Sequence, residues 1–330
     1  MRTPLSLLAD RYALGRRSVR AAALGSVVAS IAIIVTGGVV RVTGSGLGCT
    51  DWPLCTDETL APTAEMGMHG VIEFGNRLLT GLLCAVVGWV IVTARLQAKP
   101  LPAALRGGWA QFWIVVLNAI VGGVTVWMRL SPYIVAAHFL AATLLLTAAV
   151  YTWHATTAGA EDAADRPAAP EPGGAGRIRA LSTALVGVTA ALVLVGTLAT
   201  GSGPHAGDSS DVPRMPFDWT VVTVTHGVLA AAVLVLAGIL FAVLPRHGFG
   251  AARGRTLALV AVLLGQGLVG LAQSVTALPA PLVTLHLLGS ALVWVGVLRV
   301  HLTIRELHAA PTRAPHGTPQ PRSRDAAIPA

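Results

Sequence analysis

The sequence predicts an all-α polytopic membrane protein with eight transmembrane helices, arranged as two pseudo-symmetric four-helix bundles. Of its 330 residues, 54% are hydrophobic and only 12% are charged, and the mean hydropathy is +0.70. Soluble domains carry roughly 25% charged residues. Eight apolar stretches, each of about 20 residues, are long enough to cross a bilayer. The two halves of the chain also repeat the same short motifs, which predicts two related bundles.

The eight expected spans alternate with connections of opposite character. In chain order they are 20–42, 67–94, 108–128, 133–155, 178–200, 217–244, 255–275 and 281–303. The N-terminus, every second connection and the tail hold most of the Lys and Arg residues, whereas the intervening connections hold only Arg129 and Arg214. Basic segments stay in the cytoplasm, so both termini are expected there, with the protein in the cell membrane. The net charge of +8 is therefore interpreted as a topology signal and not as nucleic-acid binding.

The start of the chain does not resemble a cleavable signal peptide. Its first apolar span is longer than the roughly 7–15 residues of a signal-peptide apolar region, and no clear small-residue cleavage site follows it. We therefore expect no cleaved leader.

The repeat defines the expected domains. Thr43-Gly44-Ser45-Gly46 ends the first span and Thr200-Gly201-Ser202-Gly203 ends the fifth, while His138 and His286 each follow a proline by a few residues. Both halves begin on the same side of the membrane, so the repeat is parallel. We expect an N-terminal bundle over 1–155, a flexible cytoplasmic linker over 156–177, a C-terminal bundle over 178–305 and a disordered tail over 306–330.

Four polar residues share one face of the second span. His69, Glu73, Asn76 and Arg77 fall at positions i, i+4, i+7 and i+8, a spacing that places them together on a helix. Such groups are costly in lipid, so this face is expected to look into the protein, a cavity or a ligand.

Four histidines lie inside predicted spans: His69, His138, His226 and His286. A hydrogen bond between helices is the ordinary explanation for any single one of them. His226 and His286, however, fall at the same depth on the second and fourth helices of one bundle, which suits the two axial ligands of a heme iron. Zinc is disfavoured because no third and fourth ligand lies nearby in the sequence.

Cys49 and Cys55 flank Thr-Asp-Trp-Pro-Leu in the first outer connection. They face an oxidising compartment, and a disulfide between them is expected. A structural staple is the default interpretation, and a redox role remains open. Cys84 lies in mid-span, where a small buried hydrophobic residue is expected.

Residues 37–55 carry a family resemblance. They read Gly-Gly-Val-Val-Arg-Val-Thr-Gly-Ser-Gly-Leu-Gly-Cys-Thr-Asp-Trp-Pro-Leu-Cys and resemble the first-loop signature of heme A synthases, in the form with a cysteine pair. The Glu-x-x-[His]-Arg element of the second span and the sequence contexts of His138, His226 and His286 are similar to that family as well. The resemblance extends nearly to residue 305, and the loop signature is its most specific part.

The resemblance implies an activity and a set of partners. The family oxidises a ring methyl of heme o to a formyl group by successive hydroxylations, giving heme A for terminal oxidase assembly. Heme o would be the substrate and heme b the resident cofactor. Heme O synthase, an electron donor and membrane lipid would be partners, and a homo-oligomer is compatible with the resemblance.

The resemblance also implies residue roles. His226 and His286 would ligate heme b, while the N-terminal bundle would bind heme o with His138 as an iron ligand and Glu73 as the catalytic carboxylate. A structural pair of Glu73 with Arg77, one helical turn on, is the alternative. Arg41 would hold a heme propionate near the outer surface.

One departure from the family concerns Asn76, which stands where the family usually has histidine. Aligning the Thr-Gly-Ser-Gly motifs places His69 opposite His226, whereas aligning His138 with His286 places residue 78, close to Asn76, opposite His226. Two geometries follow: a substrate heme held by His69 and His138, or one held by His138 alone with an open face. We expect the first, because imidazole ligates heme iron and a neutral amide rarely does.

Two other classes of function compete with a heme-modifying enzyme. A non-catalytic b-type electron-transfer protein would also need histidine pairs, but it has no use for the buried carboxylate of Glu73. A transporter built from a repeat is disfavoured because no pair of helices is interrupted by Gly or Pro at mid-membrane.

Overall fold

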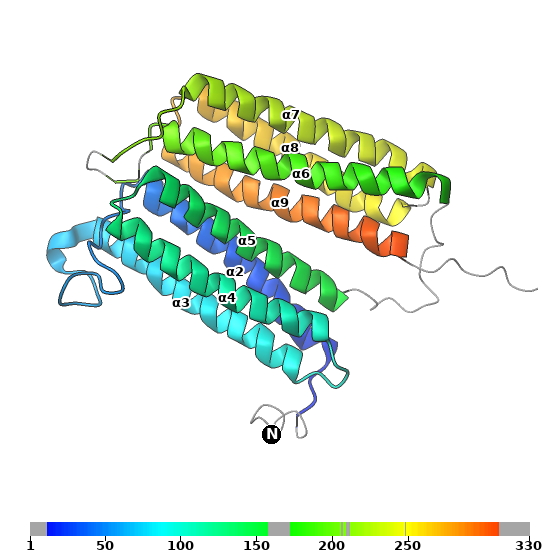
Figure 1. The fold of residues 1–330 in the computed structure, drawn as a ribbon, viewed down its shortest axis with the longest axis horizontal. Coiled ribbons are helices and arrows are strands. Elements are labelled where there is room, and N and C mark those ends of the chain that lie inside the picture. Colours follow the sequence, from blue (N-terminus) through cyan, green and yellow to red (C-terminus); the bar gives the residue numbers. More distant parts are fainter. Residues whose placement is uncertain (1–11, 158–171, 206, 209–211, 248, 310–330) are drawn as a thin grey trace, which may run out of the picture.

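The computed structural model describes residues 12–157, 172–205, 207–208, 212–247 and 249–309. Eight long α-helices dominate this part of the chain (Figure 1): α2 Arg16–Val42, α3 Gly67–Arg95, α4 Pro102–Trp127, α5 Pro132–Thr157, α6 Pro172–Ser202, α7 Trp219–Val243, α8 Gly250–Val275 and α9 Ala280–Ala309. The short 3-10 helices η1 (Ala64–Met66) and η2 (Leu244–His247) precede α3 and follow α7. All eight long helices meet the length and hydropathy needed to cross a membrane. The predicted all-α, eight-span membrane protein is thereby confirmed.

Most helices extend a few residues beyond the predicted spans, and α6 and α9 also extend well beyond the predicted domain limits. Helix α6 begins at Pro172, inside the predicted linker over 156–177, because Ala175 and Ile178 are buried in the core, and this packing outweighs the low helix propensity of the glycine-rich stretch. Helix α9 continues to Ala309, beyond the predicted domain limit at residue 305, and Leu307 packs against the buried apolar cluster of α6–α9. The remainder of the predicted linker (158–171) and of the predicted disordered tail (310–330) lies outside the described residues.

The helices pack in two groups of four. Helices α2–α5 lie together and α6–α9 lie together, and the two groups meet along α2 and α5 on one side and α9 and α6 on the other (Figure 1). At this interface Trp294 of α9 donates a hydrogen bond from Nε1 to Thr147 Oγ1 of α5 at 2.8 Å. Val27 of α2 and Leu298 of α9 belong to the buried apolar cluster around it. A two-fold relation between the groups remains a prediction.

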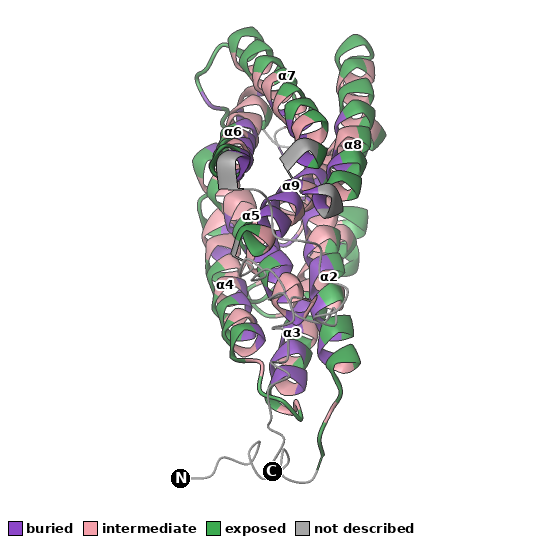
Figure 2. Cartoon of the chain, turned by 90° about the vertical axis from the view of Figure 1, so that its right-hand side faces the viewer, coloured by how far each residue is buried: buried purple, intermediate pink, exposed green. Residues whose placement is uncertain are grey.

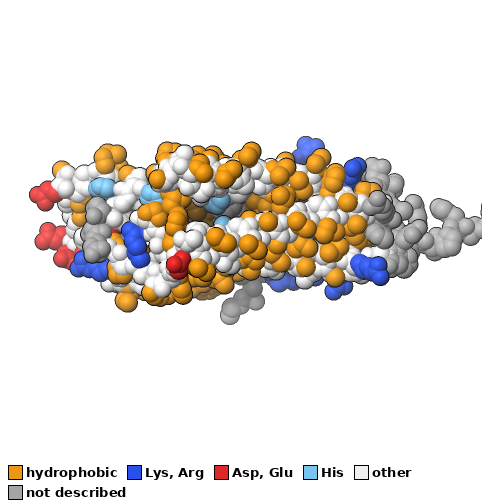
Figure 3. All heavy atoms as spheres, turned by 90° about the horizontal axis from the view of Figure 1, so that it is seen from above, with side chains coloured by type: hydrophobic (Ala, Val, Ile, Leu, Met, Phe, Trp, Pro, Cys, Tyr) orange, Lys and Arg blue, Asp and Glu red, His pale blue; other side chains and the backbone are white. Residues whose placement is uncertain are grey.

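One end of the molecule carries the connections 43–66, 128–131, 203–218 and 276–279, and we refer to it as the loop end. The two short connections there are alike: Arg129 and Leu130 have φ of 48° and 57°, and Ala277 and Leu278 both have φ of 59°. The long connections meet across the two groups, since the amide of Gly46 donates to the carbonyl oxygen of Gly207 at 2.8 Å. Acidic side chains gather at this end of the face seen in Figure 3. The cytoplasmic location of the opposite end remains a prediction.

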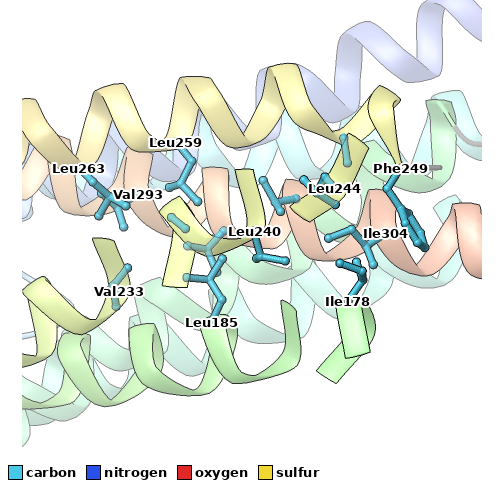
Figure 4. Close-up of a cluster of buried hydrophobic side chains, with 14 of the residues drawn as sticks. Ile178, Leu185, Val233, Leu240, Leu244, Phe249, Leu259, Leu263, Val293 and Ile304 are labelled. Atoms are coloured by element: carbon cyan, nitrogen blue, oxygen red, sulfur yellow. The ribbon is translucent and has the colours of Figure 1, made fainter. Parts of the chain in front are cut away.

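Buried side chains are unevenly distributed along α6–α9. A large apolar cluster, which includes Leu185, Leu240 and Phe249, packs the half of this group farther from the loop end (Figure 4). In the loop-end half, by contrast, no residue of 219–232, 264–275 or 280–290 is buried. Figure 2, which looks along the helices from one end, shows buried residues on the helix faces turned toward other helices and exposed residues on the outer faces. Side chains are therefore packed less tightly in the loop-end half of this bundle than in the other half.

Candidate functional site

His226 of α7 and His286 of α9 face each other in the less packed half of the second bundle. Their ring centroids are 6.2 Å apart, with an interplanar angle of 55°. An iron–nitrogen bond of about 2 Å and about 1.1 Å from nitrogen to ring centre, on each side of the metal, place two axial imidazole centres roughly 6 Å apart. The separation therefore fits a heme iron between the rings.

The hydrogen bonding of these rings is consistent with that fit. The ring of His226 interacts with the backbone of Leu192, and Nδ1 of His286 is buried without a hydrogen-bond partner. In the described part of the chain no hydrogen bond occupies Nε2 of either ring, which leaves that nitrogen available to iron. Figure 3 shows this face of the molecule hollowed, with histidine side chains visible in the hollow. A flat ring system with its iron between the two imidazoles would fill space that the apolar side chains of α7, α8 and α9 leave open.

Each of these histidines lies against a glycine of the preceding helix. A Cβ atom added at Gly196 of α6 would lie 3.1 Å from Cε1 of His226, and one added at Gly270 of α8 would lie 3.6 Å from Cε1 of His286. The glycines thus let the neighbouring backbone approach the ring edge closely. They set how far each ring can turn, and so they act as positioning residues for the pair.

The first bundle contains one histidine of the same kind. His138 of α5 has a buried, unpartnered Nδ1 and lies against Gly122 of α4, where an added Cβ would be 3.0 Å from its Cε1. His138 therefore has the same environment as His226 and His286. No second imidazole is within ring-contact distance of it among the described residues.

Glu73 of α3 is buried, with 6% of its surface exposed, and both of its carboxylate oxygens are engaged. Oε2 accepts a hydrogen bond from the backbone amide of Cys49 at 2.6 Å, and Oε1 accepts one from Arg77 Nη2 at 2.5 Å. Arg77 Nη1 also donates to the carbonyl oxygens of Asp51 and Leu54. The Glu73–Arg77 pair considered from the sequence is thus present, and it anchors the first outer connection onto α3.

That connection is closed by the Cys49–Cys55 disulfide, so the predicted pairing is confirmed. Both cysteines are fully buried. Between them, Trp52 packs edge-to-face on Trp127 of α4 with ring centroids 5.7 Å apart. The disulfide loop consequently covers the loop end of α3 and α4, directly above Glu73. Cys84 is a free cysteine and is exposed, which differs from the buried position expected from the sequence; it lies in a membrane-spanning helix, where the lipid itself solvates an outward-facing thiol.

The oxidation state of the two loop cysteines can be tested with Cys84 as an internal control. After denaturation without reductant, we expect an alkylating reagent to modify Cys84 alone, and to modify Cys49 and Cys55 only after reduction. Mass spectrometry of the labelled peptides measures this. Recovery of both loop cysteines alkylated before reduction would contradict the disulfide.

The contact of Trp52 with Gly123 of α4 predicts opposite effects for two glycine-to-alanine changes. A Cβ at Gly123 would lie 2.6 Å from Trp52 Cδ2, whereas one at Gly88 of α3 meets nothing within 4 Å. Alanine is the better helix former by about 1 kcal/mol, but overpacking costs about 1–3 kcal/mol. Gly123→Ala is expected to lower the melting temperature of the purified protein and Gly88→Ala to leave it equal or higher. If the two variants had equal melting temperatures, Trp52 would be able to move away from the added Cβ without a measurable loss of stability.

His69 and Asn76, the two candidates for a ligand on α3, lie in different surroundings. His69 is exposed, and its Nδ1 is 2.9 Å from Ser45 Oγ at the loop end. Asn76 is half-buried, and its Oδ1 accepts a hydrogen bond from Thr36 Oγ1 of α2 at 2.8 Å. The structure therefore brings Glu73, Arg77 and Cys49 together, and it keeps His69 apart, beside Ser45. Whether His69 reaches iron remains a prediction.

Arg41, predicted to hold a heme propionate, bridges the two groups of helices at the loop end. Its Nε donates to the carbonyl oxygen of His205 and its Nη2 to that of Thr200, each at 2.9 Å. His205 in turn contacts the carbonyl oxygen of Leu278 through Nε2 at 2.8 Å. A role for Arg41 toward a propionate stays a prediction, and the observed contacts give it a structural role in joining the bundles.

The sequence interpretation missed the residues that support the histidines: Thr36, Gly122, Gly196 and Gly270. A signal for two of them was available, because Gly122–His138 and Gly270–His286 share the same spacing of 16 residues. Thr36 had no comparable signal, since its role depends on which face of α2 turns toward Asn76.

The comparisons with known proteins agree with these observations. The family model described as COX15-CtaA, cytochrome oxidase assembly protein, matches residues 20–298. A heme A synthase of Alkalihalophilus pseudofirmus is 33% identical over 132 residues, covering 37% of this chain and 44% of that protein. Heme A synthases of Geobacillus thermodenitrificans and Bacillus cereus (strain AH187) are each 28% identical, over 34% and 38% of this chain and 35% and 40% of their own lengths.

The chain thus spans less than half the length of the curated relatives it matches. The family model, by contrast, matches almost all of the eight spans, from within α2 to within α9. The chain is a multi-pass membrane protein that belongs to the COX15-CtaA family of cytochrome oxidase assembly proteins.

Proposed function

We propose that this protein is a heme A synthase, which oxidises a ring methyl of heme o to the formyl group of heme A. The observation that carries the proposal is the difference between the two bundles. One presents two histidines at the separation of axial heme ligands, and the other presents one such histidine, His138, on a bundle that also holds the buried carboxylate of Glu73. A resident redox cofactor and a reacting substrate need these two different environments.

The C-terminal bundle would hold heme b between His226 and His286. Bound there, heme b supplies reversible one-electron transfer. The protein contributes the two imidazoles, fixed in orientation by the close approach of Gly196 and Gly270, and the apolar walls that keep water from the ring.

The N-terminal bundle would hold heme o, with His138 as a protein ligand. Glu73 is fixed between the Cys49 amide and Arg77, so its negative charge has a defined position. Such a preorganised carboxylate can accept a proton from the reacting methyl group or stabilise positive charge that develops on its carbon during oxidation. The Arg77 guanidinium keeps the carboxylate oriented while it does so.

The proposed topology rests on the distribution of Lys and Arg residues, and the proposed partners rest on the reaction. Both termini lie in the cytoplasm, the disulfide loop lies on the outer side of the cell membrane, and Arg41 holds a heme propionate at that side. Heme O synthase, which makes the substrate, and an electron donor are the expected partners within the lipid bilayer.

A pigment comparison tests the proposed reaction. Membranes of a host that makes heme o but no heme A are expected to accumulate heme A when this chain is expressed, as measured by chromatography of extracted hemes. If the membranes gain protein-bound heme b but their heme o is not converted to heme A, the result would contradict the synthase and favour a b-type electron-transfer protein.

A further inference from the structure

The described part of the chain forms four helical hairpins, each of which places a supporting residue of one helix against a polar residue of the next. One hairpin differs from the others. In three of them the pair is a glycine with a histidine: Gly122–His138, Gly196–His226 and Gly270–His286. In the hairpin of α2 and α3 the corresponding contact joins Thr36 to Asn76. The difference concerns the site at which the substrate heme would bind.

The four supporting residues occupy equivalent places in their helices. Thr36 lies six residues before the end of α2 at Val42, as Gly196 lies six residues before the end of α6 at Ser202. Gly122 and Gly270 each lie five residues before the ends of α4 and α8. With a rise of about 1.5 Å per residue, all four are roughly 8–9 Å from the loop end of their helix.

This equivalence identifies Asn76, and not His69, as the counterpart of His226. The motif alignment that favoured His69 requires the two long connections to match, but 43–66 is longer than 203–218. His69 lies seven residues before Asn76, about 10 Å nearer the loop end. There it is exposed and hydrogen-bonded to Ser45.

The chemistry of the Thr36–Asn76 pair does not suit iron ligation. The Thr36 hydroxyl occupies a lone pair of Oδ1, and the amide nitrogen of Asn76 carries N–H donors and no lone pair for a metal. The Thr36 side chain also fills the place in which glycine lets an imidazole edge approach the neighbouring backbone in the other three hairpins.

We propose that the heme in the N-terminal bundle is held by His138 alone, and that Asn76, fixed by Thr36, lines its second, open face. The identity of this heme as heme o rests on the proposed function, whereas its ligation is argued from the residues alone. It gives the two bundles different reactivity: both faces of the C-terminal heme are closed by imidazole, whereas the N-terminal heme keeps a coordination position for a small ligand such as dioxygen.

The ligation is measured by electron paramagnetic resonance of the full-length protein, loaded without oxygen with ferric heme o in addition to its heme b. The wild type is expected to show one low-spin and one high-spin ferric heme, the high-spin signal depending on His138. Asn76→His combined with Thr36→Gly, which recreates the pair found in the other hairpins, is expected to convert the high-spin heme to low-spin. His69→Ala is expected to leave the wild-type spectrum unchanged.

A reciprocal variant serves as the matched control. His226→Asn, which gives the second bundle the residue found at position 76, is expected to convert the low-spin heme to high-spin. The unchanged signal of the heme that is not targeted reports that each variant is folded.

Two results would overturn the inference. One is a second low-spin heme in the wild type that disappears in His69→Ala; the other is a high-spin signal that persists in Thr36→Gly/Asn76→His. Product analysis is separate from these outcomes. If heme o is five-coordinate but is never oxidised, the proposed synthase activity is refuted and the proposed ligation stands. If heme A forms in a protein with two low-spin hemes, the synthase activity stands and the proposed ligation is refuted.

Discussion

Replacing His226 or His286 with alanine is expected to abolish the low-spin heme b signal of the purified protein. The two rings are 6.2 Å apart, so each would supply one axial bond, and loss of either leaves iron with a single protein ligand. A weak-field ligand such as water cannot replace imidazole in keeping the iron low-spin. Visible absorption and electron paramagnetic resonance spectra of each variant, normalised to protein, measure the effect.

His301 provides a matched control on the same helix as His286. His301 is buried, but its Nδ1 is 3.1 Å from Ser182 Oγ, and no contact with another imidazole ring is found for it among the described residues. His301→Ala is therefore expected to keep the full low-spin signal. A His226→Ala or His286→Ala protein that also keeps it would remove the pair from the heme site.

Two substitutions of Glu73 are expected to separate its chemical role from its structural one. In Glu73→Gln the side-chain oxygen can still accept the hydrogen bond from the Cys49 amide, but the negative charge is lost. Glu73→Ala removes the anchor of the disulfide loop as well. If the charge takes part in methyl oxidation, Glu73→Gln lowers heme A formation roughly 10²–10⁴-fold while heme b binding is unchanged.

The stability of each variant provides the second reading. Glu73→Ala leaves the Arg77 guanidinium half-buried without its carboxylate, and is expected to lower the melting temperature more than Glu73→Gln. If Glu73→Gln formed heme A at the wild-type rate, the role of Glu73 would be to anchor the loop, and its negative charge would take no part in the reaction.

Much of the fold could be predicted from the sequence, because a long apolar segment in a membrane satisfies its backbone hydrogen bonds internally by forming an α-helix. All eight expected spans are present. The start of α6 and the end of α9 could not be placed, since Ala175 and Leu307 extend these helices through tertiary packing that local propensity does not contain. The Cys49–Cys55 pairing was predictable from short spacing within one loop.

The surroundings of the site residues were less accessible to sequence. The i, i+4 spacing indicated the Glu73–Arg77 contact, but not the Cys49 amide on the other carboxylate oxygen, because that contact depends on how the disulfide loop folds back over α3. Asn76 was recognised as a departure, yet its hydrogen bond to Thr36 depends on the rotation of two helices about their axes. Periodicity in one helix does not determine the rotation of its neighbour.

Two separate hemes are expected to occupy the two bundles, and the heme content of two variants tests this most directly. Full-length protein purified from a host that makes heme o is expected to yield heme b, together with heme o or heme A, on extraction and chromatography. His138→Ala is expected to retain heme b and to lose heme o and heme A. The double variant His226→Ala/His286→Ala, which leaves no imidazole at the other site, is expected to lose heme b and retain heme o. Loss of the same heme from both variants would contradict the account.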